Sequence, residues 1–134
     1  MILVDTGPLV AIIRPADQYH EECAEALELL HEPMLAPWAV IGEAMHLLKY
    51  SHEAQDALWE MIEIEVLHLG ELDDEDVKRM RYLMRKYRDL PMDFADAALV
   101  ALAEREHINR IFTIDRRDFS IYKPAGMKRF EIIP

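Results

Sequence analysis

The sequence predicts a three-layer α/β domain in which a central parallel sheet is flanked by helices. Two observations support this fold class. Short apolar runs alternate with helical patterns along the whole chain, and no long linker or internal repeat divides it. The 134 residues, 51% hydrophobic and 31% charged, have the length and composition of one globular domain with a real core. We therefore expect a single domain over residues 1–134.

Five short apolar runs are the expected strands. In chain order they are MILV (1–4), a weaker MLA (34–36), IEVLHL (64–69), RIFTI (110–114) and a possible fifth, RFEII (129–133). Helical patterns lie between them, near residues 8–13, 18–31, 38–49, 52–62, 73–88 and 93–106. Within residues 71–89 the acids precede the bases, as a helix dipole favours, so we interpret these charges as structural.

Cys23 is the one cysteine of the chain, which excludes internal disulfides and cysteine-rich zinc sites. We expect it to be a small buried apolar residue in a protein of a reducing compartment such as the cytoplasm. The amino-terminal run MILVDTGPLVAIIRP has no basic region ahead of it, and Asp5 interrupts it. Neither a signal peptide nor a membrane span is expected.

The net charge of −11 argues against a simple electrostatic binder of nucleic acid. It does not exclude a metal-dependent enzyme, because acids gathered around divalent cations are neutralised there. The basic residues are unevenly placed: residues 110–134 hold six Lys and Arg against three acids. That basic end is either a solvated face or a surface that contacts phosphates.

Two aspartates lie in the first turn of the apolar helix expected within PMDFADAALVALAE (91–104). Asp93 is a candidate N-cap, and Asp96 stands where a capping box places its acid, so both can be purely structural. Residues three apart also share a helix face. The pair can therefore join a functional site if other acids arrive from elsewhere in the chain.

Acidic residues elsewhere in the chain lie at positions suited to such a site. Asp5 directly follows the first expected strand and Asp115 closes the fourth, and ligands bind at the carboxyl ends of parallel strands. Glu43 lies on an apolar stripe between Val40 and Leu47, where a surface glutamate is not expected. A partly buried acid that reaches water or forms a salt bridge is the alternative for Glu43.

Clustered carboxylates either share protons or hold a cation. Oxygen ligands suit Mg²⁺ or Mn²⁺ rather than zinc. The only two threonines, Thr6 beside Asp5 and Thr113 two residues before Asp115, are candidates to hydrogen-bond these carboxylates or a metal-bound water, or to pack in a turn and a strand. A Gly-x-Ser-x-Gly elbow, a glycine-rich phosphate loop and a His-Glu-x-x-His motif are all absent.

Four segments, ILVDTGPLVAII, IGEAMHLL, DFADAALVALAE and FTIDRRDF, resemble the ordered acidic motifs of PIN-domain ribonucleases, especially the VapC-type toxins of toxin–antitoxin pairs. The resemblance spans the whole chain. It implies a PIN-like fold in which a catalytic metal site is formed by Asp5, Glu43, Asp96 and Asp115. Two further residues, Asp93 and Asp118, match positions that are acidic only in some members.

The activity that this resemblance implies is metal-assisted hydrolysis of an RNA phosphodiester. One or two Mg²⁺ or Mn²⁺ ions would polarise the phosphoryl oxygen, lower the pKa of a bound water and stabilise the leaving oxygen. Arg116 and Arg117 are candidates to hold flanking RNA phosphates, or are ordinary surface residues. A toxin-type member would also form a homodimer and bind a cognate antitoxin that covers the acidic cleft.

Two alternatives of different class remain. A phosphohydrolase of the haloacid-dehalogenase kind also places an aspartate after its first strand, but it needs a second one two residues later, where Gly7 stands. In a non-catalytic PIN-like binding module, the acids would persist only as helix caps and strand-end residues.

Overall fold

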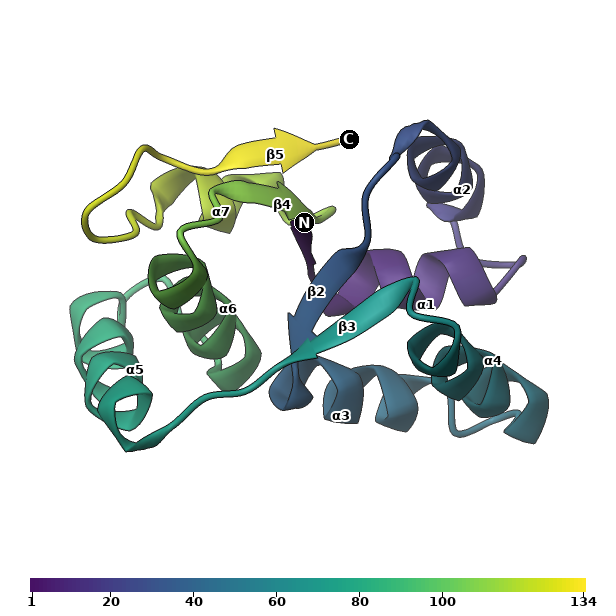
Figure 1. Ribbon diagram of the computed structural model, residues 1–134, viewed down its shortest axis with the longest axis horizontal. Coiled ribbons are helices and arrows are strands. Elements are labelled where there is room, and N and C mark those ends of the chain that lie inside the picture. Colours follow the sequence, from purple (N-terminus) through teal and green to yellow (C-terminus); the bar gives the residue numbers. More distant parts are fainter.

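The computed structural model describes residues 1–134 and contains one five-stranded sheet with the order β3-β2-β1-β4-β5 (Figure 1). All neighbouring strands run parallel. The strands are β1 (Ile2–Val4), β2 (Met34–Pro37), β3 (Leu67–Gly70), β4 (Arg110–Phe112) and β5 (Glu131–Ile133). Every expected strand is present, including the one that was only a possibility.

Seven helices surround the sheet. They are α1 (Thr6–Ile13), α2 (His20–Leu29), α3 (Trp38–Leu47), α4 (His52–Glu63), α5 (Asp74–Lys86), α6 (Phe94–Glu106) and α7 (Arg116–Ile121). In Figure 1, α5 and α6 lie on one side of the sheet and α1, α2 and α4 lie on the other. The α3 helix packs against both α1 and α6. This arrangement confirms the predicted three-layer α/β fold. No helix has the length and apolar content needed to cross a bilayer.

The α6 helix is buried between the sheet and α5, and its first turn carries part of the candidate site. Every residue from Ala95 to Ala103 is buried. A Cβ at Gly70 would lie 2.5 Å from a methyl carbon of Leu102, so glycine at the end of β3 allows α6 to approach the sheet. On the outer side, Arg79 of α5 donates two hydrogen bonds to the Glu104 carboxylate, at 2.7 and 2.9 Å. These contacts fix the position of α6.

The acids at the start of α5 are structural, as predicted, whereas Arg81 and Arg85 within it form no ion pair in the chain. Asp73 and Asp76 form a capping box at its start, because each carboxylate accepts the backbone N–H of the other residue. Arg105 of α6 contacts the Asp76 carboxylate at 2.7 Å. Cys23 is buried, as expected, and burial raises the pKa of its thiol to about 11.

The main differences from the sequence-based expectation are two element boundaries and one additional helix. The α1 helix begins at Thr6 rather than near residue 8, since the carboxylate of Asp5 caps it. The α7 helix was not predicted, and Asp115 is its N-cap. The β3 strand begins at Leu67 rather than at residue 64, because the chain turns after α4 through Glu65, whose φ is 62°.

Candidate active site

The candidate site begins where β1 and β4 end side by side. Val4 pairs with Phe112, and the N–H of Asp5 donates to the Phe112 carbonyl at 3.0 Å. The residues that follow the two strands, Asp5 and Thr113, therefore emerge as neighbours. This is also the point where the chain order of the strands reverses in the sheet, the usual place for a ligand in an open parallel sheet.

The Thr113 hydroxyl connects two of the predicted acids. It donates to Oδ2 of Asp5 at 2.9 Å and accepts the backbone N–H of Asp115 at 3.0 Å. Thr113 thus makes the carboxylate contact that the sequence analysis considered for it. Thr6 contributes its backbone N–H, which donates to Oδ1 of Asp5 at 2.8 Å, whereas its buried hydroxyl has no hydrogen-bond partner.

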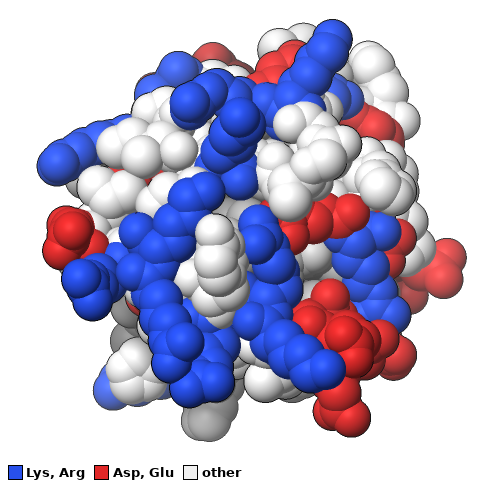
Figure 2. Space-filling view, turned by 90° about the vertical axis from the view of Figure 1, so that its left-hand side faces the viewer, with Lys and Arg blue, Asp and Glu red and all other residues white.

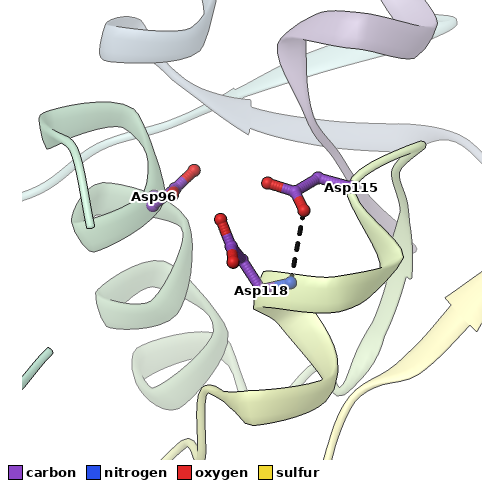
Figure 3. Close-up of side chains that lie close together, drawn as sticks. All are labelled: Asp96, Asp115 and Asp118. Carbon is purple, nitrogen blue, oxygen red and sulfur yellow. Dashed lines mark hydrogen bonds between the residues drawn. The ribbon is translucent and has the colours of Figure 1, made fainter. Parts of the chain in front are cut away.

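Three carboxylates converge next to this point. Asp96 comes from the first turn of α6, Asp115 precedes α7 and Asp118 lies in its first turn (Figure 3). One oxygen from each lies within 4.8 Å of the others. The N–H of Asp118 donates to Asp115 at 3.2 Å. This all-oxygen group is of the kind that holds a hard divalent cation.

Asp93 and Asp96 have different roles. The carboxylate of Asp93 accepts the N–H of Asp96 at 2.8 Å, which confirms Asp93 as the N-cap of α6. Asp96 does not return the hydrogen bond of a capping box. Its Oδ2 instead accepts the hydroxyl of Tyr122 at 2.8 Å. The second aspartate is therefore directed into the site rather than at the helix end.

Tyr122 is the site residue that the sequence analysis missed. It is fully buried and packs edge-on against Tyr87 and Phe119, with ring centroids 5.0 and 5.2 Å away. Burial and the contact with Asp96 raise the pKa of the phenol above its usual range, so it remains a hydrogen-bond donor. Nothing in the sequence marks this residue, because its partner lies 26 positions away.

Glu43 does not lie on the buried face of α3, so the predicted apolar stripe between Val40 and Leu47 is wrong. The buried face is formed by Val40, Ile41, Ala44 and Leu48. Glu43 is exposed and lines a hollow of about 530 Å³ together with Asp93 and Phe94. Its negative charge still contributes to raising the pKa of Asp5. Glu43 and Asp5 thus flank the three-carboxylate group without belonging to it.

The carboxylates hold protons more tightly than ordinary aspartates do. Burial raises the pKa of Asp5 to about 6, although hydrogen bonds from Thr6 and Thr113 act in the opposite direction. Burial, together with the charges of Asp93, Asp5 and Asp115, raises the pKa of Asp96 to about 7. Burial and Asp115 also raise the pKa of Asp118. The site is therefore one that protons or a cation stabilise.

Arg116 and Arg117 are the first two residues of α7. Both are exposed, and neither forms an ion pair within the chain. They stand directly after Asp115, so their guanidinium groups are available at the edge of the acidic site.

Gly7 occupies the position where a phosphohydrolase of the haloacid-dehalogenase kind would need its second aspartate. A Cβ at this position would lie 2.8 Å from the side chain of Ile114. An aspartate, which that mechanism needs here, would require the Ile114 side chain to move. The second acid of a haloacid-dehalogenase site is absent from this chain.

The model of the PIN domain family matches residues 2–123. The chain belongs to the PIN domain family. The resemblance of its acidic motifs to that family is thereby confirmed, and the arrangement of sheet and helices described above is a PIN fold.

Individual relatives match the chain over its whole length. Ribonuclease VapC26 of Mycobacterium tuberculosis is 27% identical over 135 residues, which cover 99% of this chain and 100% of that protein. The crystal structure of Mycobacterium tuberculosis VapC20, described as a sarcin-ricin loop cleaving toxin, has a TM-score of 0.84 at 20% identity and 100% coverage of both chains. A toxin–antitoxin complex from Klebsiella pneumoniae has a TM-score of 0.71 at 19% identity, covering 100% of this chain and 97% of that one.

We predict that the metal-free protein becomes less stable as pH rises from about 4 to about 7. The folded state retains protons on Asp5 and Asp96 that the unfolded chain, whose aspartates titrate near pH 4, has already released. Denaturation with urea in the presence of chelator, at several pH values, would measure the free energy of unfolding. Saturating Mg²⁺ should reverse the decline.

Asp96→Asn isolates the contribution of one carboxylate, because asparagine can still accept the Tyr122 hydroxyl. Near pH 7.5 this variant should be more stable than the wild type by at least about 1 kcal/mol, since one pKa unit corresponds to about 1.4 kcal/mol. The advantage should disappear near pH 4.5. The exposed Asp56→Asn is the charge-matched control. A loss of roughly 0.3 to 1 kcal/mol in Asp96→Asn would instead identify Asp96 as a helix-end acid.

Tyr122→Phe should shift metal binding to higher pH. The phenol hydrogen bond lowers the pKa of Asp96, so its removal leaves a carboxylate that ionises less readily. We expect the pH midpoint of Mn²⁺ affinity, measured by calorimetry, to rise by roughly one unit, as for loss of a hydrogen bond to a charged group. The control is Tyr87→Phe, which removes a hydroxyl that accepts the Lys123 N–H but touches no carboxylate. An equal shift in both variants would contradict this role.

Proposed function

We propose that the chain is a divalent-metal-dependent endoribonuclease that hydrolyses RNA phosphodiester bonds and serves as the toxin of a toxin–antitoxin pair. The convergence of Asp96, Asp115 and Asp118 at the carboxyl edge of a PIN-domain sheet carries this proposal. RNA as the substrate is supported by relatives named ribonuclease VapC26 and sarcin-ricin loop cleaving toxin VapC20.

The proposed metal ligands are Asp96 and Asp115, whose carboxylates converge with that of Asp118, together with Asp5, which flanks this group, and Glu43, which approaches from α3. This donor set fits Mg²⁺ or Mn²⁺, because all its atoms are carboxylate oxygens and their crowding leaves negative charge to be neutralised. When bound, the cation supplies the positive charge that polarises the scissile phosphoryl group and makes water a better nucleophile.

The remaining side chains position these carboxylates. Thr113 holds the Asp5 carboxylate and the backbone of Asp115 in a fixed relation. Tyr122 occupies one oxygen of Asp96 and leaves the other for a ligand. Asp93 keeps the first turn of α6 in place. No side chain of the protein needs to act as nucleophile.

Partners follow from the same proposal. Arg116 and Arg117 hold phosphates that flank the cleaved bond. A cognate antitoxin covers the acidic cleft, and the active protein is a homodimer. The relation of the chain to the Klebsiella pneumoniae toxin–antitoxin complex supports an antitoxin partner.

Purified protein incubated with mixed structured RNAs should cleave them in Mg²⁺ or Mn²⁺ and not in chelator. Asp96→Asn should abolish cleavage, because a ligand is lost. Asp93→Asn should retain much of the activity, since asparagine is also a good N-cap. Cleavage that persists in chelator would refute the metal mechanism. Failure to bind Mn²⁺ in calorimetry would favour a non-catalytic PIN-like module.

Replacement of both Arg116 and Arg117 by alanine should weaken RNA binding and leave Mn²⁺ affinity nearly unchanged. Each lost phosphate contact on single-stranded RNA should reduce the slope of log K against log salt by about 0.7. Filter binding at several salt concentrations gives this slope. An unaltered slope would show that both arginines are ordinary surface residues that do not contact RNA phosphates.

A further inference from the structure

The net charge of −11 is unevenly distributed along the sequence, because its amino-terminal part is acidic and its carboxyl-terminal part is basic. Residues 1–77 contain 18 acids and only two bases, Arg14 and Lys49. Residues 78–134 contain 13 bases and eight acids. Figure 2 shows the side of the molecule on which α5 lies, where Lys and Arg side chains form a broad band. One face of this acidic protein is therefore basic.

The outer side of α5 carries a groove within this basic face. Its lining consists of Val77, Met80, Arg81, Met84, Arg85, Arg88 and Phe94, around a hollow of about 530 Å³. Arg81 and Arg85 are four residues apart on one side of α5, and Arg88 follows in the turn directly after the helix ends. The apolar side chains of α5 and the ring of Phe94, from the start of α6, supply the rest of the surface.

The three groove arginines have no partner in the chain. Other basic residues of α5 do: Lys78 pairs with Glu75, and Arg79 pairs with Glu104. Arg81, Arg85 and Arg88 are exposed, and none lies within ion-pair distance of an acid. In a chain with an excess of acids, three unpaired guanidinium groups in a row are available for an anionic ligand.

Phe94 connects this groove to the acidic site. Its side chain is 62% exposed although it stands at the first position of a buried helix. The same ring lines a second hollow, of about 530 Å³, together with Trp38, Glu43 and Asp93. A path along the surface therefore leads from the arginines of the groove, past an exposed aromatic ring, to Glu43 and Asp93, which lie beside the acidic site.

We propose that this groove, formed by α5 and Phe94, binds a single-stranded segment of RNA next to the scissile phosphate. The arginines contact phosphates, while Phe94 and the methionines contact unpaired bases. Unpaired guanidinium groups beside an aromatic and apolar surface are the features with which proteins hold single strands. A duplex would present only its backbone and leave the apolar surface unused. The inference rests on the proposed ribonuclease function for its choice of RNA.

The test measures binding separately from cleavage. Affinity of a short labelled single-stranded RNA is followed by fluorescence anisotropy in chelator, at several salt concentrations. Arg81→Ala/Arg85→Ala should bind about tenfold or more weakly, and its salt slope should fall by about 1.4 for two lost contacts. The control Arg14→Ala/Lys49→Ala removes the same charge from the acidic half and should bind like the wild type.

Phe94→Leu tests the contact with bases. Leucine keeps an apolar side chain at this exposed position but cannot stack on a base. The affinity for single-stranded RNA should fall about fivefold or more, with the salt slope unchanged. Affinity for an RNA duplex should not change. Equal effects on single strand and duplex would overturn the assignment of the groove to a single strand.

Other outcomes would also overturn the proposal. Wild-type affinity in Arg81→Ala/Arg85→Ala, or an equal loss in the Arg14→Ala/Lys49→Ala control, would show that the groove has no specific role. Dissociation of an oligomer in the groove variant, seen by light scattering, would assign this face to a second copy of the chain. A further outcome separates this inference from the proposed function. If the groove variant loses RNA binding but the wild type shows no metal-dependent cleavage, the ribonuclease function would be refuted while the assignment of the groove to RNA would stand.

Discussion

The pairing of Val4 with Phe112 is the constraint on which the candidate site depends. It makes Asp5 and Thr113 neighbours although 107 residues of chain separate them. Through its hydroxyl, Thr113 then joins Asp5 to the N-terminus of α7, which directs Asp115 and Asp118 toward α6. A shift in this register would separate the threonine from the aspartate, and the acids would no longer converge.

The aspartates of the candidate site have opposing effects on the stability of the folded protein. Asp93 and Asp115 cap helices and accept backbone N–H groups, which stabilises the chain locally. Asp5 also caps a helix, but it and Asp96 are buried among like charges, which raises their pKa values and makes ionisation near neutral pH unfavourable. At this edge of the sheet, the aspartates therefore stabilise the local backbone while the repulsion between their charges destabilises the folded protein. Such a conflict is expected where residues are retained for function, and a bound cation would remove it.

Sequence patterns were sufficient for the strands and for the acids at strand and helix ends, because those features are local. Sequence patterns were insufficient where the local sequence allows two arrangements and only tertiary packing determines which of them forms. The face of α3 that contacts α1 and α6 excludes Glu43, although its sequence also allows a stripe that includes it. Likewise, α7 has only six residues, too few to show a helical period, and the contact of Tyr122 with Asp96 joins residues of different elements.

The separation of charge resolves the apparent conflict between an acidic protein and the anionic substrate that we propose for it. Electrostatic effects at the surface are screened over about 8 Å at physiological salt, so a strand that lies along Arg81, Arg85 and Arg88 responds mainly to these arginines. The acids at the start of α5 lie at the amino-terminal end of the same helix. The scissile phosphate, in contrast, must enter a site whose crowded carboxylates would repel it. The groove along α5 can hold the strand without a cation, whereas approach of the phosphate to Asp96 and Asp115 requires one. RNA binding and cleavage should therefore depend on different charges, and only cleavage should depend strictly on the metal.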